Sequence, residues 1–140
     1  MVSLFDILGP VMVGPSSSHT AGACRLGLMA RAILGGTPER ARIRLHGSFA
    51  ATGEGHGTHR ALLGGLIGLP PDDLRLRDAY DEATAAGLEW EFEKVDLGED
   101  AHPNTTIFDV ERADERVQLR GASVGGGRIV ITEIDGFAVS

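Results

Sequence analysis

The spacing of apolar side chains predicts one long helix in the first quarter of the chain. Residues 19–34 carry apolar side chains at helical intervals, at Cys24, Leu26, Leu28, Met29, Ile33 and Leu34. Two glycines and then a proline follow within four residues, which is typical of the end of a helix. In residues 41–46, Ile43 and Leu45 alternate with arginines, so this segment is predicted to be a strand.

The middle of the chain predicts two further helices with a break between them. Residues 48–69 are rich in glycine at first and become helical around residues 61–63. The sequence Pro-Pro-Asp-Asp at residues 70–73 ends this pattern, because proline has no amide hydrogen and cannot continue a helix. Residues 78–86 then suit a short helix that Gly87 closes.

The last third of the chain has the pattern of strands. Four segments are predicted as strands, and they occupy residues 88–93, 106–110, 117–119 and 128–134. In the first of them Leu88, Trp90 and Phe92 alternate with three glutamates, which is the period of a half-buried strand. The polar pair at residues 114–115 suits a tight turn between two antiparallel strands.

Helices early in the chain and strands late in it predict an α+β fold. We expect a largely antiparallel sheet with helices packed on one face. The chain has 140 residues, of which 42% are hydrophobic, so one domain over residues 1–140 can bury roughly two-thirds of its unfolded surface.

Charge and composition exclude several classes of function. The formal net charge is -7, which argues against nucleic acid as a partner, because such binding relies on a basic surface. No apolar run approaches the roughly 20 residues of a membrane span, so no membrane association is expected. Residues 1–6 have neither the basic region nor the apolar core of a signal peptide, so the cytoplasm is the expected compartment.

The only cysteine, the only lysine and the histidine at position 46 narrow the chemistry expected of this chain. Cys24 is the only cysteine, so it can neither form an internal disulfide nor supply a four-cysteine metal site. Lys94 is the only lysine and lies among acidic residues in a half-exposed strand, so it is expected to be a surface charge. A pyridoxal phosphate enzyme needs a lysine for its Schiff base, so this cofactor is not expected here. His46 ends a predicted strand and is expected to be structural.

The richest cluster of reactive groups stands just before the first predicted helix. Residues 14–20 read Gly-Pro-Ser-Ser-Ser-His-Thr. Gly-Pro fixes a turn and serine is a strong N-cap, so the segment leads into the start of the helix. A helix N-terminus has free N–H groups and a partial positive charge, and it readily holds a carboxylate or phosphate. One serine is enough for a cap, so the surplus of hydroxyls favours a ligand site over a plain cap.

Three other segments carry groups that suit such a site. Residues 53–59, Gly-Glu-Gly-His-Gly-Thr-His, allow close backbone approach to a ligand and expose His56, which can move protons near neutral pH. Residues 102–105, His-Pro-Asn-Thr, combine an imidazole, a rigid turn and an amide. Residues 123–127, Ser-Val-Gly-Gly-Gly, form a hairpin bulge or a backbone site for a carboxylate. Each segment also has a plain alternative as a connection or turn. No metal site is predicted, because His56 and His59 have no further suitable ligands nearby.

These segments together resemble one protein family over residues 3–139. The motifs lie at residues 3–10, where the sequence is Ser-Leu-Phe-Asp-Ile-Leu-Gly-Pro, and at residues 14–20, 53–58, 102–105 and 123–127. In order and spacing they are similar to the β subunit, or β domain, of the iron–sulfur-dependent bacterial L-serine dehydratases. The string at residues 14–20 is specific, whereas the glycine strings are not.

The resemblance implies an elimination reaction. L-serine loses water to give aminoacrylate, which hydrolyses to pyruvate and ammonia, a step of serine catabolism that feeds gluconeogenesis. A 4Fe-4S cluster acts as a Lewis acid on the leaving hydroxyl. The resemblance implies that the cysteines of this cluster belong to a separate α subunit, and that the isolated β chain is inactive. It leaves open whether the isolated chain forms a homo-oligomer.

The resemblance also carries implications for fold and domain content. It implies a fold shared with the serine-related regulatory domain of some phosphoglycerate dehydrogenases. Many two-chain β subunits continue into an ACT domain, and this sequence is expected to lack one. His59 stands where the family pattern has an acidic residue, which leaves the role of His59 open.

The residues and the resemblance together define a site hypothesis. The catalytic candidates are His19, His56 and Ser17, with the two imidazoles as proton-transfer groups. The substrate-binding candidates are Ser16, Ser18, Thr20, Thr58, His102, Asn104, Ser123, Gly125 and Gly126. The alternative hypothesis is a non-catalytic regulatory module that binds serine as an effector, and a weaker third one is a metal hydrolase built from the histidines.

Overall fold

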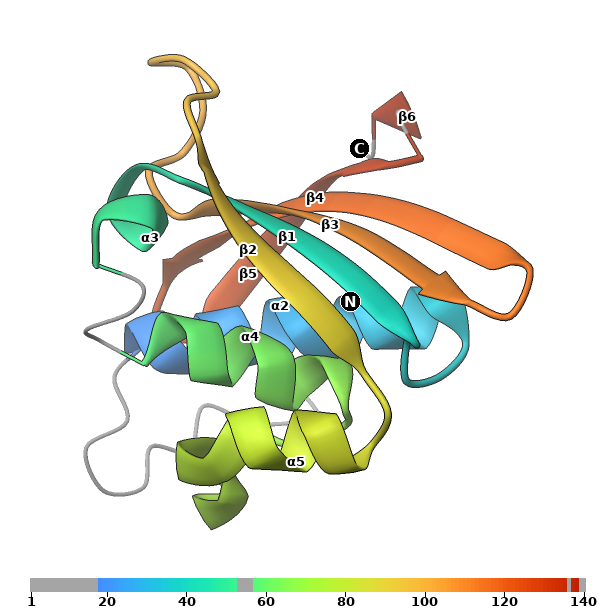
Figure 1. Cartoon of the computed structure of the whole chain (residues 1–140). Coiled ribbons are helices and arrows are strands. Elements are labelled where there is room, and N and C mark those ends of the chain that lie inside the picture. Colours follow the sequence, from blue (N-terminus) through green and yellow to red (C-terminus); the bar gives the residue numbers. More distant parts are fainter. Residues whose placement is uncertain (1–17, 53–56, 136, 139–140) are drawn as a thin grey trace.

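In the computed structural model, the described residues are 18–52, 57–135 and 137–138, and they form a sheet layer and a helix layer (Figure 1). Within these residues the sheet has six strands in the order β2-β1-β3-β4-β5-β6. The strands are β1 (Arg40–His46), β2 (Glu89–Val95), β3 (Thr105–Arg112), β4 (Glu115–Gly125), β5 (Arg128–Ile134) and β6 (Phe137–Ala138). The predicted α+β class is therefore confirmed.

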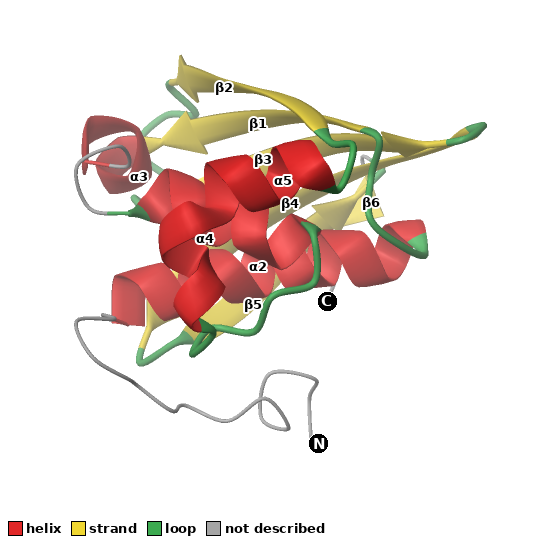
Figure 2. Ribbon diagram, turned by 60° about the horizontal axis from the view of Figure 1, so that its bottom comes forward, coloured by secondary structure: helices red, strands yellow, loops and turns green. Residues whose placement is uncertain are grey.

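The helix layer covers one face of this sheet. The helices are α2 (Ser18–Leu34), α3 (Gly47–Thr52), α4 (Thr58–Leu66), the 3₁₀ helix η1 (Leu74–Asp78) and α5 (Ala79–Ala85). Figure 2 shows α2, α4 and α5 side by side on the same side of the strands, whereas α3 stands at the end of β1. None of the helices in the described part of the chain is long and apolar enough to cross a membrane.

The sheet is antiparallel except at one edge. Strand β1 pairs with β3 in antiparallel register but with β2 in parallel register, Arg40 standing opposite Glu89. Parallel neighbours need a crossover connection, and here the chain passes through α3, α4 and α5 between β1 and β2. The helices of this crossover connection therefore form part of the helix layer.

Strand alternation separates a buried face of the sheet from a charged one. Ile43 stands between Phe92 on β2 and Phe108 on β3, and this row faces the helices. One residue earlier, Arg42 stands between Glu91 and Asp109 on the opposite face. A one-residue slip would exchange the two faces, so the apolar pattern fixes the register.

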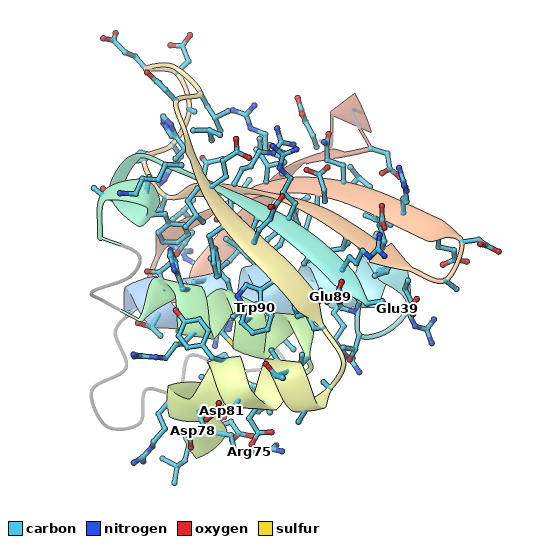
Figure 3. The ribbon with its side chains drawn as sticks, viewed as in Figure 1. Glu39, Arg75, Asp78, Asp81, Glu89 and Trp90 are labelled. Atoms are coloured by element: carbon cyan, nitrogen blue, oxygen red, sulfur yellow. The ribbon has the colours of Figure 1, made fainter. Side chains whose placement is uncertain are left out.

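Side chains from the crossover helices close the core beneath β2. The ring of Trp90 stacks on Tyr80 of α5 with centroids 6.0 Å apart, and Figure 3 shows Trp90 directed from β2 into the helix layer. In the same view Arg75, Asp78 and Asp81 lie at the bottom of the molecule, on η1 and α5. The expected half-buried character of β2 is confirmed.

Several predicted boundaries need correction. Residues 47–52, expected as part of a glycine-rich connection, form the helix α3. The strand predicted at residues 117–119 spans Glu115–Gly125, because residues beyond the apolar stretch continue the ladder with β3 and β5. The 3₁₀ helix η1 and the two-residue strand β6 were not predicted. The motif at residues 3–10 lies outside the described residues.

Candidate functional site

Several elements that carry predicted site residues meet at one end of the molecule. Helices α2 and α4 both begin there, beside the β4–β5 hairpin and the start of β3 (Figure 1). The first N–H groups of a helix have no partner within the helix and give its N-terminus a partial positive charge, so the dipoles of α2 and α4 reinforce each other at this end. The arrangement favours a negatively charged group in this region.

The predicted residues around the first helix are described only in part. Ser16, Ser17 and His56 lie outside the described residues. Ser18 and His19 form the first residues of α2, as expected for a segment that leads into a helix, and Thr20 follows in the same turn.

Thr58 opens α4 with its side chain fully buried. Its exposed fraction is 0%, and its hydroxyl has no hydrogen-bond partner among the residues that the structure describes. The preceding Gly57 has φ 78°, a left-handed conformation that side chains rarely adopt, and no side chain caps this helix. An unsatisfied buried hydroxyl is uncommon, so Thr58 is well suited to a hydrogen bond with a ligand or another chain.

The His-Pro-Asn-Thr turn is tied to the end of β4. The backbone N–H of Ser123 donates to the carbonyl of Asn104 at 3.1 Å, and the Asn104 amide nitrogen lies 3.5 Å from the carbonyl oxygen of Ser123. The Asn104 Oδ1 atom is buried, and no described residue forms a hydrogen bond with it. The structure therefore brings together two predicted segments that lie about twenty residues apart in the sequence.

Within the same turn, His102 has a defined tautomer. Its Nδ1 accepts a hydrogen bond from the backbone N–H of Asn104 at 3.0 Å. An accepting Nδ1 places the proton of the neutral ring on Nε2, so His102 presents a donor at that atom. The side chain is exposed, which suits a role in orienting a ligand.

The same turn also holds the start of α3. The backbone N–H of Ser48 donates to the carbonyl of Pro103 at 2.7 Å. A Cβ on Gly47 would overlap the Pro103 backbone, so this close approach requires glycine. The segment that precedes His56 in the sequence is thereby fixed against the His102–Asn104 turn.

Helix α2 reaches the same region through a small residue. A Cβ on Gly22 would overlap the Ser123 hydroxyl, so only glycine lets α2 pack this closely on β4. Ser123 is buried, whereas Gly125 and Gly126 lie exposed in the hairpin turn with open space around them. The binding candidates His102, Asn104 and Ser123 therefore lie close together. The two hairpin glycines, Gly125 and Gly126, lie at the exposed edge of this region.

Arg25 is a feature of this region that the sequence reasoning did not single out. Its side chain is only 3% exposed, and Nη1 donates to the carbonyl of Gly127 at 2.5 Å. Nε and Nη2 are buried and have no hydrogen-bond partner in the described part of the chain, and burial lowers the pKa of the guanidinium. The available signal was a charged residue between Cys24 and Leu26, inside the apolar face of a helix.

Two other histidines have structural contacts. The ring of His59 stacks on Phe92 of β2 with centroids 3.9 Å apart and an interplanar angle of 8°. His46 accepts a hydrogen bond at Nδ1 from the backbone N–H of Leu97 at 3.0 Å, which confirms its expected structural role. Both rings are thereby assigned to packing between elements.

The single cysteine and the single lysine lie as expected. Cys24 is 0% exposed, and its thiol donates to the carbonyl of Leu69 at 3.1 Å. Desolvation by burial raises the pKa of the Cys24 thiol to about 12. Lys94 is exposed on β2, as expected for a surface charge.

A shallow depression of about 840 Å³ lies on the charged face of the sheet, away from this end. Its walls include Arg44, which pairs with Asp109 at 2.8 Å, and Gln118, which donates to Asp109 at 2.7 Å. None of the predicted site residues that the structure describes lines it. Among the described residues, no three His, Cys, Asp or Glu side chains converge as a metal site would require.

Comparison with known proteins gives a consistent result. The sequence model of the family described as "Serine dehydratase beta chain" matches residues 3–134. The "L-serine dehydratase, beta chain" of Peptoniphilus asaccharolyticus is 44% identical over 139 residues, covering 98% of this chain and 62% of the relative. The "Probable L-serine dehydratase, beta chain" of Bacillus subtilis is 47% identical over 135 residues, covering 96% of this chain and 61% of the relative. The chain thus spans about three-fifths of the length of these two relatives.

Proposed function

Because this chain belongs to the serine dehydratase β-chain family, we propose that it forms one wall of an active site for L-serine. A separate α chain completes the site. The reaction is the elimination of water from L-serine to give aminoacrylate, which hydrolyses to pyruvate and ammonia. We place the assembled enzyme in the cytoplasm and expect it to work without pyridoxal phosphate.

One observation supports this location for the site above all others. Buried polar groups lie at the end of the molecule where α2 and α4 begin. They include the Thr58 hydroxyl and the Asn104 Oδ1, and Asn104 is hydrogen-bonded to Ser123. Neither the Thr58 hydroxyl nor the Asn104 Oδ1 has a hydrogen-bond partner among the described residues. An amino acid carries the kinds of donor and acceptor group that these atoms lack.

We assign the following roles to side chains of this chain. The hydroxyls of Ser16, Ser17, Ser18 and Thr20 position the carboxylate or hydroxyl of serine at the N-terminus of α2. His19 or His56 takes the proton from the Cα atom and returns a proton to the departing oxygen. His102, through its Nε2–H donor, and Asn104, through Oδ1, orient the substrate.

The proposed 4Fe-4S cluster belongs to the α chain. Cys24 does not fit a cluster ligand, because its thiol is fully buried, is held protonated and donates to the Leu69 carbonyl. Cluster ligation needs a deprotonated sulfur. The described residues of this chain offer no other cysteine, since Cys24 is the only one in the sequence.

Anaerobic co-expression with the α chain tests the two-subunit proposal. We expect the assembled pair to form pyruvate from L-serine and the isolated chain to form none. Pyruvate production by the isolated chain, or its absence from an assembled pair that contains the intact cluster, would contradict the proposal.

The His56→Ala variant tests the proton-transfer role. In the assembled pair we expect kcat to fall by about 10²–10⁴-fold, which is the usual contribution of general acid–base catalysis. His59→Phe is the matched control, because a phenyl ring can keep the stack on Phe92. A fall in kcat of less than about tenfold for His56→Ala would assign proton transfer to another group, His19 first.

Calorimetry separates catalysis from regulation. If the chain were a regulatory module, L-serine would bind to the isolated chain with micromolar affinity and change its affinity for a partner. The shared active site predicts that L-serine binds only after the α chain is present.

A further inference from the structure

Arg25 is a buried cation whose guanidinium forms a hydrogen bond on one edge only, among the described residues. It lies on the second turn of α2, under the β4–β5 hairpin, and is 3% exposed. Nη1 donates to the carbonyl of Gly127 at 2.5 Å, and this bond fixes the plane and direction of the guanidinium. The opposite edge, formed by Nε and Nη2, has no hydrogen-bond partner within residues 18–52, 57–135 and 137–138.

An unpaired buried guanidinium is unfavourable, and arginine cannot escape by losing its proton. Lysine and histidine adapt to burial by becoming neutral, whereas arginine stays charged under all ordinary conditions. Its desolvation is then offset only by a negatively charged partner. No carboxylate among the described residues pairs with Arg25, so the partner must come from outside this part of the chain.

The free edge has the geometry of a carboxylate receptor. Nε–H and Nη2–H point in parallel, and this pair of donors matches the two oxygens of one carboxylate. Gly127 lies so close to the guanidinium that a Cβ on this residue would overlap Nη1, and Ala21 lies beside the same glycine. The N-termini of α2 and α4 add positive potential at the same end of the molecule.

We propose that the Nε/Nη2 edge of Arg25 binds the α-carboxylate of the substrate amino acid. This inference rests on the proposed function and names the residue that holds the charged end of that substrate. The carboxylate gains access when the tip of the hairpin turn, at Gly125 and Gly126, shifts. The Cβ positions of these two glycines have open space around them, so the tip can move while Gly127 keeps its bond to Nη1.

The kinetic test uses Arg25→Met and Arg25→Lys in the assembled pair. Loss of a bidentate charged contact made equally in the ground and transition states raises KM and leaves kcat almost unchanged. We expect KM for L-serine to rise about 100-fold in Arg25→Met, with a smaller rise in Arg25→Lys, which keeps the charge but not the fork. Arg31→Met is the matched control, because Arg31 lies near the other end of the same helix and donates to the Thr37 hydroxyl. The KM of this variant for L-serine should stay within about threefold of the parent value.

A stability measurement separates binding from a structural role. If Arg25 serves only to hold the hairpin, Arg25→Met should lower the thermal unfolding temperature and leave KM unchanged. If Arg25 is a carboxylate receptor, methionine of similar length removes an unpaired buried charge, so the free chain should be at least as stable as the parent. If Arg25→Met does not fold, KM is measured for Arg25→Lys instead. Added methylguanidinium should also restore KM in Arg25→Lys or Arg25→Ala, which gives a second kinetic measurement.

Direct binding distinguishes failure of this inference from failure of the proposed reaction. If the wild-type pair forms no pyruvate, the proposed reaction fails, and the inference is then judged by calorimetry with L-serine and L-serine amide. Binding of L-serine that is lost in Arg25→Met, with weak binding of the amide to both proteins, supports the inference. Equal binding of L-serine to the two proteins overturns it, as does no binding to the wild type. A KM change below about threefold, or weakened association with the α chain at unchanged KM, also overturns it.

Discussion

At the scale of single residues, burial has opposite consequences for two neighbours on α2. Cys24 is buried as a neutral thiol, which needs only one weak hydrogen bond to the Leu69 carbonyl. Arg25 is buried as a cation, and half of its donors remain unpaired. The thiol is thus stable in the core by itself, whereas the guanidinium is stable there only with a partner, which is why Arg25 and not Cys24 points to function.

The raised pKa of Cys24 predicts a pH dependence of stability. The native thiol keeps its proton up to about pH 12, whereas the unfolded thiol loses its proton above its ordinary pKa of 9.0. The native state therefore binds more protons between these values, and stability falls as pH rises through this window. The contribution of this group approaches about 1.4 kcal/mol per pH unit.

Urea denaturation at a series of pH values, with Cys24→Ala as the control, measures this effect. The slope of stability against pH above about pH 9 should be steeper in the parent chain than in the variant. A thiol reagent at about pH 8 should leave the folded chain unmodified and label it after unfolding. Equal slopes, or rapid labelling of the folded chain, would show that the thiol is accessible.

At the scale of elements, the crossing of α2 and α4 depends on two glycines. A Cβ on Gly65 would overlap the carbonyl oxygen of Cys24, and one on Gly27 would overlap that of Leu62. The helices are therefore in backbone contact at this point, and their N-termini are held at the same end of the molecule. Close packing of the two helices is what places Thr58 near the start of α2.

The Gly65→Ala substitution should separate these helices. Because the overlap is with backbone atoms, the helices must shift, and we expect a loss of about 1–3 kcal/mol despite the higher helix propensity of alanine. Gly64→Ala is the control one residue away, since its Cβ meets only the end of the flexible Leu76 side chain. Urea midpoints that move equally for both variants would indicate that the crossing is not backbone-limited.

At the scale of the whole molecule, one apolar row joins the sheet to its helix layer. Phe108 on β3 is fully buried at the centre of this row, next to Ile43 and Leu119, whereas Phe92 on the edge strand β2 is only partly buried. Burial of the central strand therefore contributes more to stability than burial of the edge.

The Phe108→Ala substitution should lower the free energy of unfolding by about 3–5 kcal/mol, because it leaves a cavity in the close-packed core. Phe92→Ala removes the same atoms from a half-exposed site and should cost less than half as much. Chemical denaturation of both variants checks the ranking. A larger loss for Phe92→Ala would mean that the edge strand and the His59 stack limit stability.

The sequence by itself determined the fold class and long regular elements such as α2 and β2. The 3.6-residue period of α2 and the two-residue alternation of β2 are written in consecutive side chains, so each could be inferred within one segment. The motifs at residues 14–20 and 102–105 likewise identified the family, because they depend on residue identity alone.

Only the tertiary structure decided how these pieces meet. The parallel pairing of β1 with β2, the helix α3 and the hydrogen bonds between Asn104 and Ser123 all depend on contacts between residues far apart in the chain. In the sequence, Arg25 is one polar residue in an apolar helix face. Its unpaired edge exists because the packing of α2 on the β4–β5 hairpin excludes water while supplying a single acceptor, and no local pattern encodes that balance.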